Sequence, residues 1–141
     1  MKQILTFILF SLLLCWLMFA PIYKHVLIMR QALLQKEVDY LLEIGTNANH
    51  GYIDGTMIAQ SRERLAQHGF SETDIVYDIT TTNGQQADSA ASRVIRGEGI
   101  QLTVSYPYQE LFLIDRLIGI EGPDESARMG ARGMQMSEYV P

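Results

Sequence analysis

The sequence predicts an α+β fold, in which a long N-terminal hydrophobic helix continues into a small head with a second helix and a three- to four-stranded antiparallel sheet. Three observations predict it. An uncharged apolar run covers residues 4–22, apolar residues then recur with a helical period as far as residue 44, and the period becomes two after residue 75. The predicted segments are a transmembrane or assembly helix (1–23), its amphipathic continuation (24–50) and a globular head (51–141).

The apolar run is long enough to cross a membrane. It carries no charge between Lys2 and Lys24, and a helix needs about 20 apolar residues to span the hydrocarbon core of a bilayer. A cleaved signal peptide is the alternative, but the run exceeds the usual apolar part of such peptides, and Met18 and Pro21 disfavour cleavage after Ala20. We therefore expect a retained helix. Its predicted membrane-facing side chains are Ile4, Leu5, Phe7, Ile8, Leu9, Phe10, Leu12, Leu13, Leu14, Trp16, Leu17, Met18, Phe19 and Ile22.

The residues beside the run give two opposing indications of its orientation. Lys2 and the α-amine precede the run, whereas Lys24, Arg30 and Lys36 follow it, and positive charges favour the cytoplasmic side. This count favours a cytoplasmic C-terminal part. The short segment before the run is instead typical of a signal anchor, which would place the C-terminal part outside the cytoplasm.

Residues 24–44 are predicted to continue the helix with one apolar face. The stripe expected to pack on the sheet consists of Leu27, Leu34, Val38 and Leu41, with Leu42 beside it, while charged residues fall mainly on the other side. Gly45 and the polar residues after it end the helix. The part around Leu27 has a second possible role, which is to continue a contact between the anchors of neighbouring chains.

A second helix is predicted in the head. Asp54 or Thr56 is its expected N-cap, and Gly69 follows its C-terminus, with Phe70 making the hydrophobic contact that accompanies such an end. Residues 62–64, Arg-Glu-Arg, are expected to form a solvated face. The expected buried side consists of Met57, Ile58, Ser61, Leu65 and the stem of His68.

Strands are predicted where the apolar period becomes two. A last antiparallel strand is expected between Arg128 and Val140, ending near Tyr139, because Gly130 and Gly133 weaken a helix there. Residues 110–120 are apolar but short, and either one or two helical turns or a loop on a hydrophobic surface would accommodate them. The predicted inward-facing side chains of the first two strands are Ile75, Tyr77, Ile79, Ile100, Leu102 and Val104.

Composition argues against several classes of function. The net charge of −5 disfavours nucleic-acid binding. Cys15 is the only cysteine, and the three histidines have no partner at zinc-ligand spacing, so neither an intramolecular disulfide nor a metal site is predicted. Catalytic and phosphate-binding motifs are missing, and Glu110 and Asp115 are expected to be surface acids. We therefore expect a protein that is not an enzyme and uses no cofactor.

Two short motifs accompany this layout. Val104-Ser105-Tyr106-Pro107-Tyr108 ends the predicted middle strand, and the last strand closes on Met136-Ser137-Glu138-Tyr139. With its apolar helix and small head, the chain resembles TadE-like pilus proteins and the wider type IV pilin-like class, which includes pseudopilins. The resemblance implies a structural subunit of a cell-surface pilus or pseudopilus that polymerises through its N-terminal helix, whose apolar side chains would form the filament core. The chain departs from the pilin pattern in having no acidic residue before Glu37.

The same resemblance implies a location and partners. The head would lie outside the cytoplasm, on a single-pass membrane anchor before assembly and on a surface or extracellular filament afterwards. The partners would be further copies of the chain or other pilin-like subunits, and the membrane before assembly. The alternative is a single-pass membrane-anchored accessory protein whose head binds a partner protein.

Overall fold

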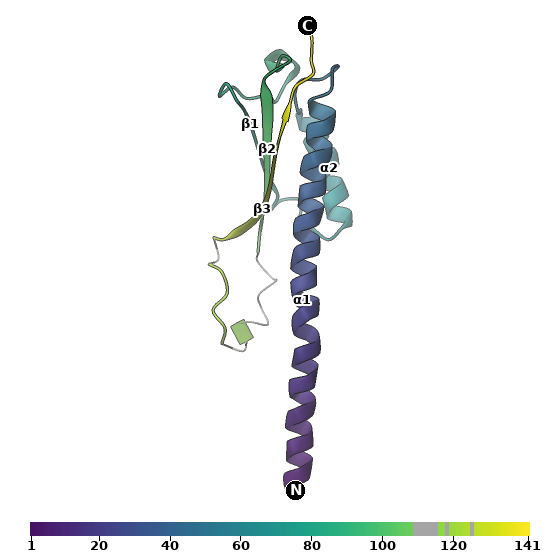
Figure 1. Ribbon diagram of the computed structural model, residues 1–141, viewed down its shortest axis with the longest axis vertical. Coiled ribbons are helices and arrows are strands. Elements are labelled where there is room, and N and C mark those ends of the chain that lie inside the picture. The colour runs from purple at the N-terminus through teal and green to yellow at the C-terminus, as the bar shows by residue number, and fades with distance from the viewer. Residues whose placement is uncertain (109–115, 118, 125) are drawn as a thin grey trace. The chain divides into compact units, whose positions relative to one another are not determined.

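The computed structural model describes residues 1–108, 116–117, 119–124 and 126–141, with only the backbone of Tyr23. A long apolar helix, a further helix and three antiparallel strands confirm the α+β class. The chain divides into two compact units, residues 1–30 and residues 31–141. The elements are α1 (Lys2–Gly45), α2 (Gly55–Gln67), β1 (Val76–Thr81), the 3-10 helix η1 (Ala90–Ser92), β2 (Gly99–Pro107) and β3 (Arg128–Met136) (Figure 1).

The end of α1 lies next to the predicted one and is closed by a threonine. The helix ends at Gly45, and both the N–H and the hydroxyl of the buried Thr46 donate hydrogen bonds to the carbonyl of Leu42, at 2.9 and 2.7 Å. These bonds satisfy a carbonyl that would otherwise lack a partner in the last helical turn. α1 also includes Pro21, although proline cannot donate a backbone hydrogen bond within a helix.

α2 begins and ends at the residues that its sequence predicts. Asp54 is the N-cap, and its carboxylate accepts a hydrogen bond from the N–H of Met57 at 2.9 Å. Gly69 follows the helix with φ of 87°, a conformation that glycine adopts without strain, and Phe70 behind it is buried. The expectation that His68 belongs to the buried side is wrong. His68 is the C-cap, so its backbone has left the helical path and its side chain is exposed.

The sheet has the order β1-β2-β3, and both pairs are antiparallel. Ile79 of β1 lies opposite Leu102 of β2, which lies opposite Gly133 of β3. α1 and α2 lie on one side of this sheet (Figure 1). Tyr77 and Ile79 are half-buried because β1 is an edge strand, whereas the other predicted inward-facing side chains are fully buried, namely Ile75, Ile100, Leu102 and Val104.

The last strand is shorter than predicted. β3 ends at Met136 and does not reach Tyr139, because the residues after it bond to other segments: the N–H of Glu138 donates to the carbonyl of Thr46 at 2.8 Å, and the carbonyl of Tyr139 accepts from the N–H of Arg96 at 2.8 Å. No fourth strand occurs within the described residues. Most of the predicted segment 110–120 lies outside them.

A set of contacts, which we call the C-terminal clamp, joins the end of the chain to earlier loops. The hydroxyl of Ser137 donates to the carbonyl of Val94 at 2.6 Å, and the N–H of Val94 donates to the carbonyl of Gly51 at 2.8 Å. Gly51 has φ of 72°, and a Cβ there would lie 2.9 Å from the Cβ of Tyr139. The guanidinium of Arg93 donates to the hydroxyl of Tyr139 at 3.0 Å. The clamp therefore fixes the C-terminus to two loops that lie far from it in sequence.

Candidate functional site

The N-terminal part of α1 is apolar on every side. The predicted membrane-facing side chains are all exposed within this chain, from 45% for Leu14 to 71% for Met18. By length and composition this helix can cross a membrane. Cys15 is exposed on the same segment. Soluble proteins rarely expose a continuous apolar surface of this extent, so this segment is a candidate contact surface for lipid or for other protein helices.

The predicted helix stripe divides between the two units. Leu34 and Val38 have no exposed surface and Leu41 has 1%, and all three belong to the unit 31–141. Leu27 belongs to residues 1–30 and is only half-buried. The stripe therefore supplies core side chains to the head from Leu34 onward.

α1 lies close to the sheet at Gly133. A Cβ at this position would lie 2.8 Å from Cδ1 of Leu42 and 3.0 Å from Cγ1 of Val38. These distances are shorter than van der Waals contact, so the helix packs against the strand where a side chain is missing. In the sequence, Gly133 indicates only that its segment is a poor helix. Its inward-facing place in an alternating strand was the signal that could have identified this contact.

An ion pair joins α1 to α2. Nε and Nη2 of Arg64 donate to the two carboxylate oxygens of Glu37, each at 3.1 Å. The hydroxyl of Ser61 donates to Oε2 of Glu37 at 2.9 Å and lies 2.9 Å from the hydroxyl of Tyr77 on β1. The prediction of a solvated face at residues 62–64 is therefore wrong for Arg64. Glu37 and Arg64 lie far apart in sequence, and no local pattern predicts that they meet.

The environment of this cluster changes two pKa values. The pKa of Arg64 is raised, chiefly by its hydrogen bond to Glu37. Burial raises the pKa of Tyr77, and the nearby Glu37 carboxylate raises it further, while the hydrogen bond with Ser61 opposes the increase. The raised pKa of Arg64 favours its charged guanidinium, and the raised pKa of Tyr77 favours its neutral phenol. These are the forms that make the hydrogen bonds of the cluster at neutral pH. The cluster thus holds α1, α2 and β1 together.

A groove of about 360 Å³ lies beside the ion pair and is lined by residues of α1 and α2, including Tyr40 and His68. The guanidinium of Arg64 lies 4.7 Å from the ring centroid of Tyr40. The guanidinium of Arg64 already forms an ion pair with Glu37, so its role beside this groove is to join α1 to α2.

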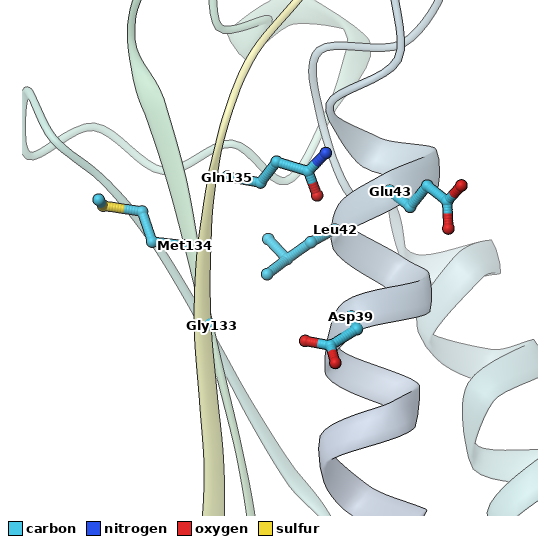
Figure 2. A pocket seen from close by; sticks show the side chains of 6 residues that line it. All are labelled: Asp39, Leu42, Glu43, Gly133, Met134 and Gln135. Carbon is cyan, nitrogen blue, oxygen red and sulfur yellow. The ribbon is translucent and has the colours of Figure 1, made fainter.

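A second groove, of about 380 Å³, separates α1 from β3 (Figure 2). Leu42 is directed toward the strand, and Met134 is directed away from the helix (Figure 2). Oδ1 of Asp39 lies 3.7 Å from the position that a Cβ on Gly133 would take. The groove carries two acids, and the residues that line it include no basic one: Asp39, Leu42, Glu43, Gly133, Met134 and Gln135.

Residues with metal-binding side chains do not gather within the described part of the chain. There, no group of three His, Cys, Asp or Glu side chains could hold a metal ion. His50 lies beside Tyr52, with ring centroids 5.8 Å apart. Glu110 and Asp115 lie outside the described residues.

Comparison with known proteins gives no relative. No protein-family model, curated protein or solved structure matches this chain.

Proposed function

We propose that this protein is a structural subunit of a cell-surface pilus or pseudopilus and that it polymerises through its N-terminal helix. The observation that carries the proposal is the apolar helix, whose side chains remain exposed in the described part of the chain. A helix that is apolar on every side can leave lipid only where other apolar surfaces replace the lipid. A bundle of identical helices provides such surfaces, so one segment can serve as membrane anchor before assembly and as filament core afterwards.

The rest of the chain supports the same proposal. A small α+β head and the motifs at residues 104–108 and 136–139 resemble TadE-like and type IV pilin-like proteins. Repeated head-to-tail contacts that do not close into a ring build a helical filament. The partners would be further copies of this chain or other pilin-like subunits.

A single-pass membrane-anchored accessory protein, whose head binds a partner protein, is the second candidate. The open groove between α1 and β3 favours it, because a groove beside a free strand edge can accept a segment of another protein. Electron microscopy of sheared cells and of the purified full chain distinguishes the two candidates. The pilus proposal requires filaments that contain this chain, whereas the accessory protein would remain in the membrane fraction.

Substitution of an arginine within the apolar helix tests the segment directly. Leu13→Arg should cost about 2.5–3.5 kcal/mol for insertion at the middle of a membrane, and we expect it to abolish filaments. Leu13→Ile is the matched control, because it keeps size and hydrophobicity, and it should fractionate and assemble like the wild type. The measurements are membrane fractionation and filament yield. Normal behaviour of Leu13→Arg in both would exclude the helix as anchor and as filament core.

The proposal also requires the head to lie outside the cytoplasm. Alkaline phosphatase fused after Pro141 should be active in intact cells, because this enzyme forms its disulfides only in an oxidising compartment. A reporter that matures only in the cytoplasm should give no signal from the same position. The opposite pair of results would agree with the count of positive charges beside the helix and would contradict an extracellular filament.

A further inference from the structure

Among the described residues, no strand pairs with the outer edge of β3. The N–H of Ser137 donates to the carbonyl of Glu98 at 2.8 Å, and this bond, together with the strand register, fixes which backbone groups of β3 face β2. The groups that turn toward β2 are those of Met129, Ala131, Gly133 and Gln135. The N–H and C=O groups that face away from β2 are those of Gly130, Arg132, Met134 and Met136.

In the part of the chain that the structure describes, hydrogen bonds satisfy outward backbone groups at Arg132 and Glu138 but not those between them. The carbonyl of Arg132 accepts a hydrogen bond from Nε2 of Gln35 at 3.5 Å. Beyond the strand, the N–H of Glu138 donates to the carbonyl of Thr46 at 2.8 Å. The outward backbone groups of the two methionines between them bond to no residue in the described part of the chain. Unpaired strand groups of this kind are a template for a further strand.

Charged side chains protect only the first half of the edge. Arg128 and Arg132 lie in that half, and charges on an edge strand discourage pairing with other chains. Residues 133–136, Gly-Met-Gln-Met, carry no charge. The unprotected half is also the part of β3 that lines the groove beside α1.

The two faces of residues 133–136 carry different kinds of side chain. On the helix side, Asp39 directs its carboxylate toward β3, whereas Glu43, one turn of helix further along, directs its carboxylate away from the strand (Figure 2). On the other side, Met134 and Met136 are 57% and 54% exposed. Successive side chains of an added strand point to opposite faces. Its residues would therefore alternate between the acidic side and the methionine side.

We propose that residues 133–136 of β3 bind an extended peptide segment of a partner protein in which basic residues alternate with apolar ones. The main chain of the segment pairs with the outward N–H and C=O groups of Met134 and Met136. A basic side chain of the segment faces the Asp39 carboxylate, and its apolar side chains pack on the methionines, whose flexible thioethers adapt to different shapes. The proposal does not depend on filament formation.

A simple peptide tests this chemistry. The probe is a short, end-blocked, labelled peptide in which lysine alternates with valine, and its fluorescence anisotropy is measured with the full chain in non-ionic detergent micelles. One control peptide has glutamate in place of lysine. A second has the same composition as the probe but groups the lysines and the valines into two blocks. We expect only the alternating lysine peptide to bind saturably.

A proline substitution tests pairing with the edge. Met134→Pro removes an outward N–H and leaves the bonds from β3 to β2 in place, because the N–H of Met134 does not face β2. Met134→Leu is the matched control, since it keeps the N–H and an apolar side chain. We expect the proline variant to bind the probe about tenfold more weakly than the leucine variant, as the loss of one or two hydrogen bonds predicts. Hydrogen exchange of the β2 amides confirms that both variants keep the sheet.

A second set of variants tests the charge. Asp39→Asn should weaken binding and reduce its dependence on salt. Glu63→Gln, an exposed position on α2, is the matched control and should bind like the wild type.

Three results would overturn the proposal. The first is equal binding by Met134→Pro and Met134→Leu, and the second is equal binding of the block peptide, which would indicate charge attraction without strand pairing. The third is a change in self-association of Met134→Pro with no peptide binding by the wild type, which would assign the edge to another copy of this chain.

Discussion

Leucines in the two units of this protein meet opposite environments. Leu14, in residues 1–30, is 45% exposed, whereas Leu34, in residues 31–141, has no exposed surface, and both belong to α1. Leu34 is fully covered within this chain, whereas no described residue covers Leu14 to the same extent. Because full burial of such a side chain is worth about 1.5–3 kcal/mol, residues 1–30 carry a large drive to associate with lipid or protein. One helix can therefore contribute buried side chains to a core at one end and expose an apolar surface at the other.

The largest expected effect comes from the buried end of the stripe. Leu41→Ala should destabilise the head by about 2–5 kcal/mol, because it removes a core side chain and leaves a cavity. Leu27→Ala is the matched change on the other side of the unit boundary, and we expect it to leave the head nearly unchanged while weakening assembly. Hydrogen exchange at the β2 amides and filament yield, both in the full chain, give the two readouts. An equal loss of head stability in both variants would contradict the prediction that Leu27, unlike Leu41, contributes little to the core of the head.

A smaller effect is expected where α1 meets the sheet. Gly133→Val should destabilise the head by about 1–3 kcal/mol, because its side chain would overlap Leu42 and Val38. Gly130→Val is the control on the same strand: the nearest atom to a Cβ there is the carbonyl oxygen of Val104, at 3.6 Å, and the position is exposed. We expect it to stay within about 0.5 kcal/mol of the wild type. Chemical denaturation of the full chain in detergent measures both, and equal stabilities would contradict the close packing at Gly133.

The smallest effect depends on pH and concerns the cluster that joins the two helices to β1. Burial raises the pKa of Tyr77 in the folded chain. The stabilisation linked to this proton is therefore full below the ordinary tyrosine pKa of about 10 and is lost as pH rises through the folded value. Tyr77→Phe should cost about 1 kcal/mol at neutral pH through its lost hydrogen bond, and the difference from the wild type should shrink above pH ~10. Denaturation at a series of pH values tests this.

Ser61→Ala provides the control for that prediction, because it removes the hydroxyl partner and keeps the phenol. It should still lose stability at alkaline pH, and the loss should extend to higher pH than in the wild type, because the missing hydrogen bond had opposed the rise in the pKa of Tyr77. A gap between Tyr77→Phe and the wild type that stays constant up to high pH would show that the phenol proton makes no contribution.

Local patterns predicted much of the fold. The apolar run and the helical period predicted α1, and Asp54 and Gly69 predicted the ends of α2. The alternation of apolar residues predicted the inward-facing side chains of the first two strands. These features depend on residues that are neighbours in sequence, so periodicity and capping rules apply to them.

Contacts between distant residues account for what was missed. Arg64 sits among charged residues and looks solvated, and only the fold brings it to Glu37. The end of β3 is set by bonds of Glu138 to Thr46, which lies at the end of α1. The groove beside Gly133 likewise exists only after a helix and a strand from opposite ends of the chain have packed together.

The C-terminal clamp has a consequence for biosynthesis. Met129 and Ala131 complete the core, and Ser137 and Tyr139 then tie loops that were made long before them. A nascent chain that lacks these last residues has neither β3 nor the clamp, and pairings between segments far apart in sequence are the slow steps of folding. The apolar helix precedes the head in the chain, so it has left the ribosome before the residues of β3 and the clamp are made. The head can therefore complete its sheet only after the apolar helix is already exposed.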